Sequence, residues 1–133
     1  MSAADSKTIV LEFIEALSNG DVEAVSAAFT EDVTWWLPGS LPVSGTYTGS
    51  KQILEGFFAT AFPYFEPNTL TITVQRAVAE INAVAVEWRV NARTAKGRTY
   101  DNYYHVSFDL RDGKICAVRE YLDSLYAKEV LFA

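Results

Sequence analysis

The stretch Ala83-Val-Ala-Val-Glu-Trp-Arg-Val-Asn-Ala-Arg93 decides the fold, because its residues alternate between an apolar row and a polar row. This period of two predicts a β-strand, since successive side chains of a strand point to opposite faces of a sheet. The apolar row consists of Val84, Val86, Trp88 and Val90. The polar row consists of Glu87, Arg89, Asn91 and Arg93. The neighbouring strand-like segments are aromatic and apolar, so we expect both faces to be covered and the polar row to line an enclosed site.

The rest of the chain predicts helices followed by an antiparallel meander. The expected strands of the meander span residues 69–79, 83–93, 100–110 and 114–123. The expected helices span residues 7–17, 21–29, 50–61 and 124–131. Ser6, Asp21 and Ser50 are the expected N-caps of the first three helices. A short strand is expected over residues 33–37 and a loop over residues 40–49. This order indicates an α+β protein with helices packed on one face of a curved sheet.

Composition limits the class of protein. A length of 133 residues suffices for a substantial core, so we expect residues 1–133 to form one domain. Aromatic residues make up 14% of the chain, which exceeds the need of a small core and indicates a ligand cavity or an interface. A net charge of −6 without a basic cluster argues against nucleic acid and anionic membranes as partners. The single cysteine and the lack of a long apolar stretch favour a soluble cytoplasmic protein.

Two passages carry recognisable motifs. The first is Asp32-Val-Thr-Trp-Trp-Leu-Pro-Gly39 with Ser44-Gly-Thr-Tyr-Thr-Gly49, and the second is Asp112-Gly-Lys-Ile-Cys-Ala-Val-Arg-Glu-Tyr-Leu-Asp123. Both resemble the SnoaL-like branch of the nuclear transport factor 2-like superfamily, which has the ketosteroid isomerase-like fold. The resemblance implies a cystatin-like α+β barrel, in which a cone-shaped antiparallel sheet and N-terminal helices enclose a deep pocket, commonly in a homodimer. It implies no single activity, because the superfamily includes isomerases, epoxide hydrolases, polyketide cyclases, dehydratases and proteins that only bind.

The residues that ketosteroid isomerases use are mostly replaced. The resemblance places Phe13 at the position of that family's tyrosine and Leu37 at the position of its aspartate base. Tyr104 falls near the position of its neutral acid. A phenylalanine cannot donate a hydrogen bond and a leucine cannot accept a proton, so steroid isomerisation by that route is not expected.

The residues of limonene-epoxide hydrolases are only partly matched. The resemblance places Arg89, Asn91 and Glu120 at the sheet positions that hold the water and protonate the epoxide in that family. Arg89 is retained and Glu120 can replace the carboxylate base, but Asn91 carries no labile proton for a leaving oxygen. Epoxide hydrolysis therefore ranks third among the functions considered.

Polyketide cyclases of the SnoaL type need one acid/base carboxylate in an apolar cavity. The leading hypothesis is a cofactor-independent isomerase, cyclase or dehydratase that transfers a proton on a hydrophobic carbonyl compound. Glu120 is the expected base, and Arg89, Asn91 or Tyr104 is the expected donor to the enolate. The residues expected to contact the ligand are Phe13, Trp35, Leu37, Phe58, Asn102, Tyr104, Leu122 and Asp123. The only histidine, His105, leaves no multi-histidine metal site and is expected to point away from the cavity.

Each candidate also has a structural interpretation. Glu120 and Arg89 can form a buried ion pair that fixes strand register, in which case the protein is a noncatalytic dimeric module that binds an apolar ligand. Asn102 and Tyr104 can be core polar groups with satisfied hydrogen bonds. Asp123 can cap the terminal helix. The expected dimer surface is the apolar row of the strand over residues 83–93, that is Val84, Val86, Trp88 and Val90.

Overall fold

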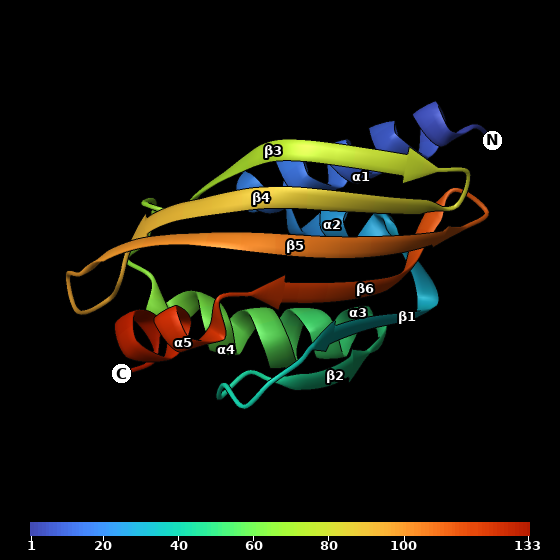
Figure 1. Cartoon of the computed structure of the whole chain (residues 1–133). Helices are drawn as coiled ribbons and strands as arrows, with labels where there is room; N and C mark the ends of the chain where they lie inside the picture. The colour runs from blue at the N-terminus through green and yellow to red at the C-terminus, as the bar shows by residue number, and fades with distance from the viewer.

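The computed structural model describes residues 1–133, which fold into a curved six-stranded sheet around helices (Figure 1). The strand order is β2-β1-β6-β5-β4-β3, so β2 and β3 are the free edges. All neighbouring strands run antiparallel except β1 and β6, which run parallel. The expected α+β fold with helices packed on a curved sheet is confirmed, with one parallel pair in an otherwise antiparallel sheet.

The predicted meander is present, and one strand was missed. The strands are β1 (Phe29–Leu37), β2 (Gly45–Thr48), β3 (Thr71–Glu80), β4 (Ala83–Arg93), β5 (Thr99–Arg111) and β6 (Lys114–Leu122). The strand β4 has the predicted bounds. The strand β2 lies within the expected loop, because its four residues pair with β1 as a short edge strand. Its Gly-Thr-Tyr-Thr sequence is too short for the alternation to be distinguished from a turn.

The N-terminal helices α1 (Ala3–Ser18) and α2 (Val22–Ala27) lie behind the strands in Figure 1. The cap of α1 is Ser2, whose side chain accepts from the backbone N–H of Asp5, while the Asp5 carboxylate accepts from the backbone N–H of Ser2. The predicted cap at Ser6 was wrong, because Ser6 is buried within the helix and its hydroxyl donates to a backbone carbonyl. Asp21 caps α2 as expected.

Two further helical segments complete the fold. The first is continuous from α3 (Gly49–Lys51) through the π-helix η1 (Gln52–Phe58) and α4 (Ala59–Ala61) to the 3₁₀ turn η2 (Phe62–Tyr64). The second is the terminal helix, formed by α5 (Ser124–Tyr126) and the π-helical turn η3 (Ala127–Leu131). None of the helices combines the length and the apolarity that a bilayer crossing requires.

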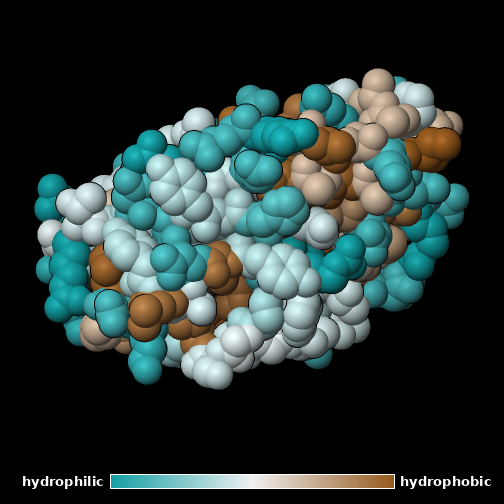
Figure 2. Space-filling model, viewed as in Figure 1, coloured by the Kyte–Doolittle hydropathy of each residue, from teal (hydrophilic) through white to brown (hydrophobic).

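The apolar row of β4 faces the helices. Val84, Val86, Trp88 and Val90 are all buried. The predicted dimer surface was therefore wrong, since this row belongs to the core. The helices cover only one face of the sheet, and the polar row lies on the other, outer face. Figure 2 shows the molecule in the same orientation as Figure 1, with hydrophilic and intermediate colours over most of the middle of this view.

Candidate functional site

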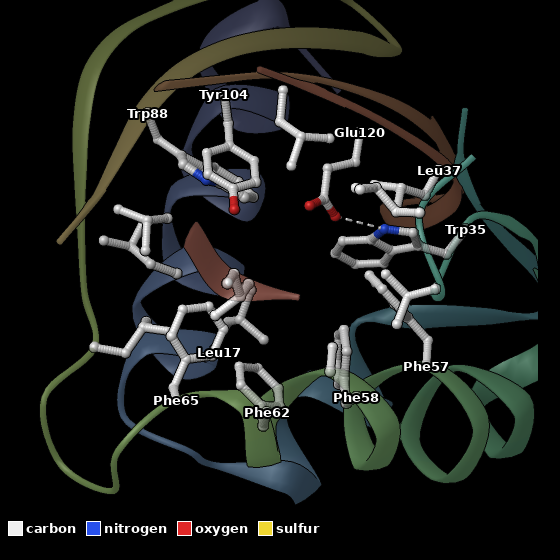
Figure 3. Close-up of a pocket in the computed structure, with 18 of the residues that line it drawn as sticks. Leu17, Trp35, Leu37, Phe57, Phe58, Phe62, Phe65, Trp88, Tyr104 and Glu120 are labelled. Atoms are coloured by element: carbon white, nitrogen blue, oxygen red, sulfur yellow. Dashed lines mark hydrogen bonds between the residues drawn. The ribbon is translucent and has the colours of Figure 1, made fainter. Parts of the chain in front are cut away.

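A cavity lies between the concave face of the sheet and the helical segment that contains Phe57, Phe58 and Phe62 (Figure 3). Nineteen residues line it and eighteen of them are hydrophobic, the exception being Glu120. The part of the cavity that the centre of a water-sized sphere can reach measures about 90 Å³. All the space between atoms, counted out to the open mouth, measures about 670 Å³. Typical ligand pockets measure roughly 300–1,000 Å³, and the reachable space of about 90 Å³ lies well below that range, so only a compact ligand fits.

Glu120 extends from β6 into this apolar space, and its exposed fraction is only 8%. The indole Nε1–H of Trp35 donates to Oε1 of Glu120 at 2.9 Å, as the dashed line in Figure 3 shows. Burial raises the pKa of the carboxyl group from 4.5 to about 7, and the hydrogen bond from Trp35 opposes this rise. Near neutral pH the side chain is thus present in both forms, and it can accept or return a proton.

The opposite wall includes Tyr104 of β5, and Tyr100 and Asn102 lie behind it. The hydroxyl groups of Tyr100 and Tyr104 lie 2.8 Å apart, and Nδ2 of Asn102 donates to the Tyr100 hydroxyl at 2.9 Å. Trp88 also lines the cavity, and its buried Nε1–H has no hydrogen-bond partner. Figure 3 shows the Tyr104 hydroxyl and the Glu120 carboxyl group facing the same space.

The structure brings most of the expected ligand contacts to the cavity. Those that line it are Trp35, Leu37, Phe58, Tyr104 and Leu122. Phe13 lies in the core instead, with its ring 6.2 Å from the ring of Trp35. Asn102 stands behind the wall and contacts it through Tyr100. Asp123 is the N-cap of α5, where its carboxylate accepts from a backbone N–H, which agrees with its structural interpretation.

The prediction that Arg89, Asn91 and Glu120 converge in one cavity was wrong. Arg89 lies on the outer face of the sheet, where Nε and an Nη donate to the Asp101 carboxylate at 2.7 and 2.6 Å. This guanidinium lowers the pKa of Asp101. Asn91 shares the face of Arg89 and lies opposite Asp101 in the register of β4 and β5. Because the helices cover the apolar face of β4, its polar row cannot reach the cavity. The proposed buried pair of Glu120 and Arg89 is absent for the same reason.

Other cavity residues were missed at the level of sequence. They include Leu17, Phe65, Trp88, Val90, Leu131 and Phe132. Trp88 was placed on the wrong side because a period of two does not tell which face the helices cover. Leu131 and Phe132 come from the far end of the chain, and no local pattern links them to β4 or β6. His105 is exposed on the outer face, away from the cavity as expected. No group of three or more His, Cys, Asp or Glu side chains could hold a metal ion.

Residues 10–118 match the model of the SnoaL-like domain. The chain belongs to the SnoaL-like family. It is similar to UPF0523 protein B of Dictyostelium discoideum, with 32% identity over 124 residues that cover 87% of this chain and 75% of that protein. An NTF2-like protein from Burkholderia xenovorans LB400 is 26% identical, with a TM-score of 0.80 and 98% of each chain covered. TerC, in a crystal structure with polyporic acid, is 20% identical, with a TM-score of 0.85 and 97% and 99% of the chains covered.

Membership in the SnoaL-like family supports a role in small-molecule binding or in chemistry of the polyketide cyclase kind. The likeness to TerC is a likeness of fold, and its ligand belongs to that protein. Within this chain, the apolar cavity around Glu120 is the place where such a role is chemically possible.

Proposed function

We propose that this SnoaL-like protein is a cofactor-independent enzyme that transfers a proton on a compact hydrophobic carbonyl compound, with Glu120 as acid and base. The observation that carries the proposal is a single buried carboxyl group in an apolar cavity, with its pKa raised to about 7. A structural buried carboxylate is usually paired with a cation, and no Lys, Arg or His lines this cavity. A general base works best when its pKa lies near the working pH.

The reaction begins when the Glu120 carboxylate removes a proton from the carbon next to the carbonyl group. The electrons of that C–H bond form the enolate, whose oxygen takes the negative charge. A hydrogen-bond donor on the opposite wall, such as the Tyr104 hydroxyl, stabilises this oxygen. The proton on Glu120 then returns to another carbon in an isomerisation, or to a leaving hydroxyl group in a dehydration. In a cyclisation, the enolate attacks a second carbonyl carbon and the resulting alkoxide takes the proton.

Trp35 supports this role by fixing the base. Its indole N–H donates to Oε1 of Glu120 at 2.9 Å, and Oε2 stays free to take a proton from a ligand. The hydrogen bond favours the ionised form, so Trp35 keeps the pKa from rising above neutrality.

The test uses one-ring ketones, which thermal shift first screens for binding. In D₂O, proton NMR then follows deuterium incorporation at the carbon next to the carbonyl group. The wild-type protein is expected to catalyse this exchange, and Glu120→Gln to slow it by about 10²- to 10⁴-fold. The matched control is Glu87→Gln, which removes an exposed carboxylate on the outer face of β4 and should leave the rate unchanged. Equal rates in the wild type and Glu120→Gln would refute the proposal.

A noncatalytic protein that binds an apolar ligand is the alternative. The predominance of hydrophobic residues in the cavity wall favours it, because such a wall gives affinity without chemistry. Ketones that bind but do not exchange deuterium would support this alternative. Epoxide hydrolysis has less support, since Glu120 is the only carboxyl group lining the cavity and Asn91 lies on the outer face.

A further inference from the structure

We propose that a hydrogen-bond chain from Asn102 through Tyr100 directs the hydroxyl proton of Tyr104 into the cavity, where it binds the carbonyl oxygen of an uncharged ligand. Tyr104 contacts the ligand, while Tyr100 and Asn102 are positioning residues. The proposal rests on the proposed function, because it names the ligand class and the oxygen-binding group of the same cavity.

The orientation of the Asn102 amide is the first step. Its Oδ1 accepts from the backbone N–H of Tyr103 at 2.8 Å, and its Nδ2 donates to the backbone carbonyl of Asp123 at 3.1 Å. A flipped amide would place a carbonyl oxygen against the Asp123 carbonyl and an N–H group against the Tyr103 N–H. The amide is therefore fixed, and its second Nδ2 hydrogen donates to the Tyr100 hydroxyl at 2.9 Å.

The direction of the next hydrogen bond follows from counting donors. The Tyr100 oxygen accepts from Asn102, so its own proton needs a different acceptor. Tyr100 is fully buried, and the Tyr104 oxygen at 2.8 Å is the acceptor within reach. If Tyr104 donated instead, the Tyr100 proton would be buried without an acceptor, which is unfavourable. Tyr100 therefore donates to Tyr104, and the proton of Tyr104 stays free for another partner.

The free proton of Tyr104 lies on the cavity side. Tyr104 lines the cavity, and Figure 3 shows its hydroxyl in the space across from Glu120. Burial raises the pKa of Tyr104 well above its usual value, so the donor keeps its proton at neutral pH. Chained hydrogen bonds polarise one another, so donation from Tyr100 makes Tyr104 a stronger donor.

A second donor belongs to the same wall. Trp88 lies opposite Tyr104 in the register of β4 and β5, and their ring centroids are 6.2 Å apart. Its Nε1–H is buried without a partner. Most buried donors in proteins are paired. An unpaired donor beside the cavity is therefore independent evidence that a bound ligand places a hydrogen-bond acceptor at this wall. The N–H group of Trp88 and the O–H group of Tyr104 make this wall electropositive. The facing wall is negative or neutral, depending on the protonation of Glu120.

The charge of the lining excludes most ionic ligands. An anion would lose its water without gaining a cationic partner, and the Glu120 carboxylate would repel it. A cation would pair with Glu120 but would face the donors of Tyr104 and Trp88. A neutral compound with one carbonyl oxygen satisfies both walls, since the oxygen accepts from Tyr104 and the adjacent C–H group meets the base.

The first experiment compares four compounds that share an eight-carbon skeleton: acetophenone, ethylbenzene, phenylacetate and 1-phenylethylamine. NMR titration at about pH 8, where all side chains of the cavity except Glu120 are neutral, gives their affinities. Acetophenone is expected to bind about tenfold more tightly than ethylbenzene. Tyr104→Phe should bring this ratio close to one, whereas Tyr103→Phe, its neighbour on the outer face, should leave the ratio unchanged. A missing preference for acetophenone, or tighter binding of either ion, would overturn the proposal.

The second experiment measures the hydrogen bond itself. The carbonyl stretching frequency of bound ¹³C-acetophenone should be lower than its frequency in hexane. It should return to nearly the hexane frequency in Tyr104→Phe and only part of the way in Tyr100→Phe. An unchanged band in Tyr100→Phe would overturn the positioning role. Glu120→Gln should slow deuterium exchange by about 10²- to 10⁴-fold but leave the band shifted, so failure of the proposed catalysis and failure of this inference are distinguishable. Circular dichroism checks that each variant is folded.

Discussion

At the scale of single residues, the chemistry depends on the environment of Glu120. Burial disfavours its charged form, one indole N–H favours it, and no cation lines the cavity. The result is a carboxyl group whose pKa lies near neutrality, where a structural ion pair would have lowered it. Arg89 shows the contrast, because its pairing with Asp101 lowers the pKa of that carboxyl group.

The raised pKa of Glu120 predicts a specific dependence of stability on pH. Between pH 4.5 and about 7 the folded protein keeps a proton that the unfolded chain has released, so raising the pH favours unfolding. The free energy of unfolding of the wild type should therefore fall relative to that of Glu120→Gln across this window, by up to about 3 kcal/mol at about 1.4 kcal/mol per pKa unit. Urea denaturation at several pH values measures it, and parallel curves would contradict the prediction.

The hydrogen bond from Trp35 lowers the pKa of Glu120, so removing it predicts a further rise. In Trp35→Phe the carboxylate loses its hydrogen-bond donor, so the pKa of Glu120 should rise further. The pH dependence of deuterium exchange should move to higher pH, because Glu120 then loses its proton only at a higher pH. Trp36→Phe is the control, since Trp36 lies on the outer face of the same strand and packs on Tyr121. A profile that moves equally in both variants would contradict the role of Trp35.

At the scale of elements, the strand β4 shows what the sequence can and cannot predict. Its bounds, Ala83–Arg93, follow from the alternation alone. The alternation does not tell which row faces the helices, and that choice depends on where α1 packs. Assigning the polar row to the cavity wrongly placed Arg89 and Asn91 in the site and left Trp88 out of it. Glu120 was identified because it belongs to the family motif. Tyr104 was identified from its position in the resemblance and from the alternation of its own strand, which places it on the inner face.

The terminal helix is the other element that could not be placed from sequence. It carries Leu131 to the cavity, and Phe132 follows it there. Leu17 lines the same cavity although it lies more than a hundred positions earlier in the chain, and nothing in the local pattern of either segment predicts this proximity. The N-cap Asp123 was recognised as one of two possible roles for that residue, and the structure provides the hydrogen bond that supports it.

This cap leads to a prediction. Asp123→Ala removes the acceptor of the Tyr126 backbone N–H, which lies 3.0 Å away, so the free energy of unfolding should fall by about 1 kcal/mol. Acetophenone binding should weaken as well, since the frayed helix carries part of the cavity wall. Asp123→Asn keeps an oxygen acceptor and should behave like the wild type. Urea denaturation measures the stability, and a loss of equal size in both variants would point away from capping.

At the scale of the whole molecule, the two faces of the sheet have different roles. The concave face and the helices enclose the cavity, while the outer face exposes Tyr103 and Tyr121 at 56% and 42%. Trp36 packs edge-on against Tyr121 on this face, with ring centroids 5.7 Å apart. Aromatic side chains are enriched in protein interfaces, so the expected homodimer is now predicted to form through this outer face rather than through the apolar row of β4.

Light scattering coupled to size-exclusion chromatography tests this association. The wild type should have the mass of a dimer, and Tyr121→Lys should be a monomer, because a lysine in the centre of the paired faces would be desolvated and repelled by its symmetry mate. Val22→Lys is the control, since it replaces an exposed hydrophobic residue on α2. A monomeric wild type, or dissociation by both lysines alike, would contradict an interface on the outer face.

The proposed role of Glu120 as acid and base depends on a pKa near neutrality, which burial in the apolar cavity produces. Carbon-13 NMR of the Glu120 carboxyl carbon across a pH titration tests this claim most directly, with Arg89→Ala as the control. We expect a midpoint near pH 7 that does not change in Arg89→Ala, because that guanidinium lies on the other face of the sheet. A midpoint at or below 4.5, or one that rises when Arg89 is removed, would contradict it.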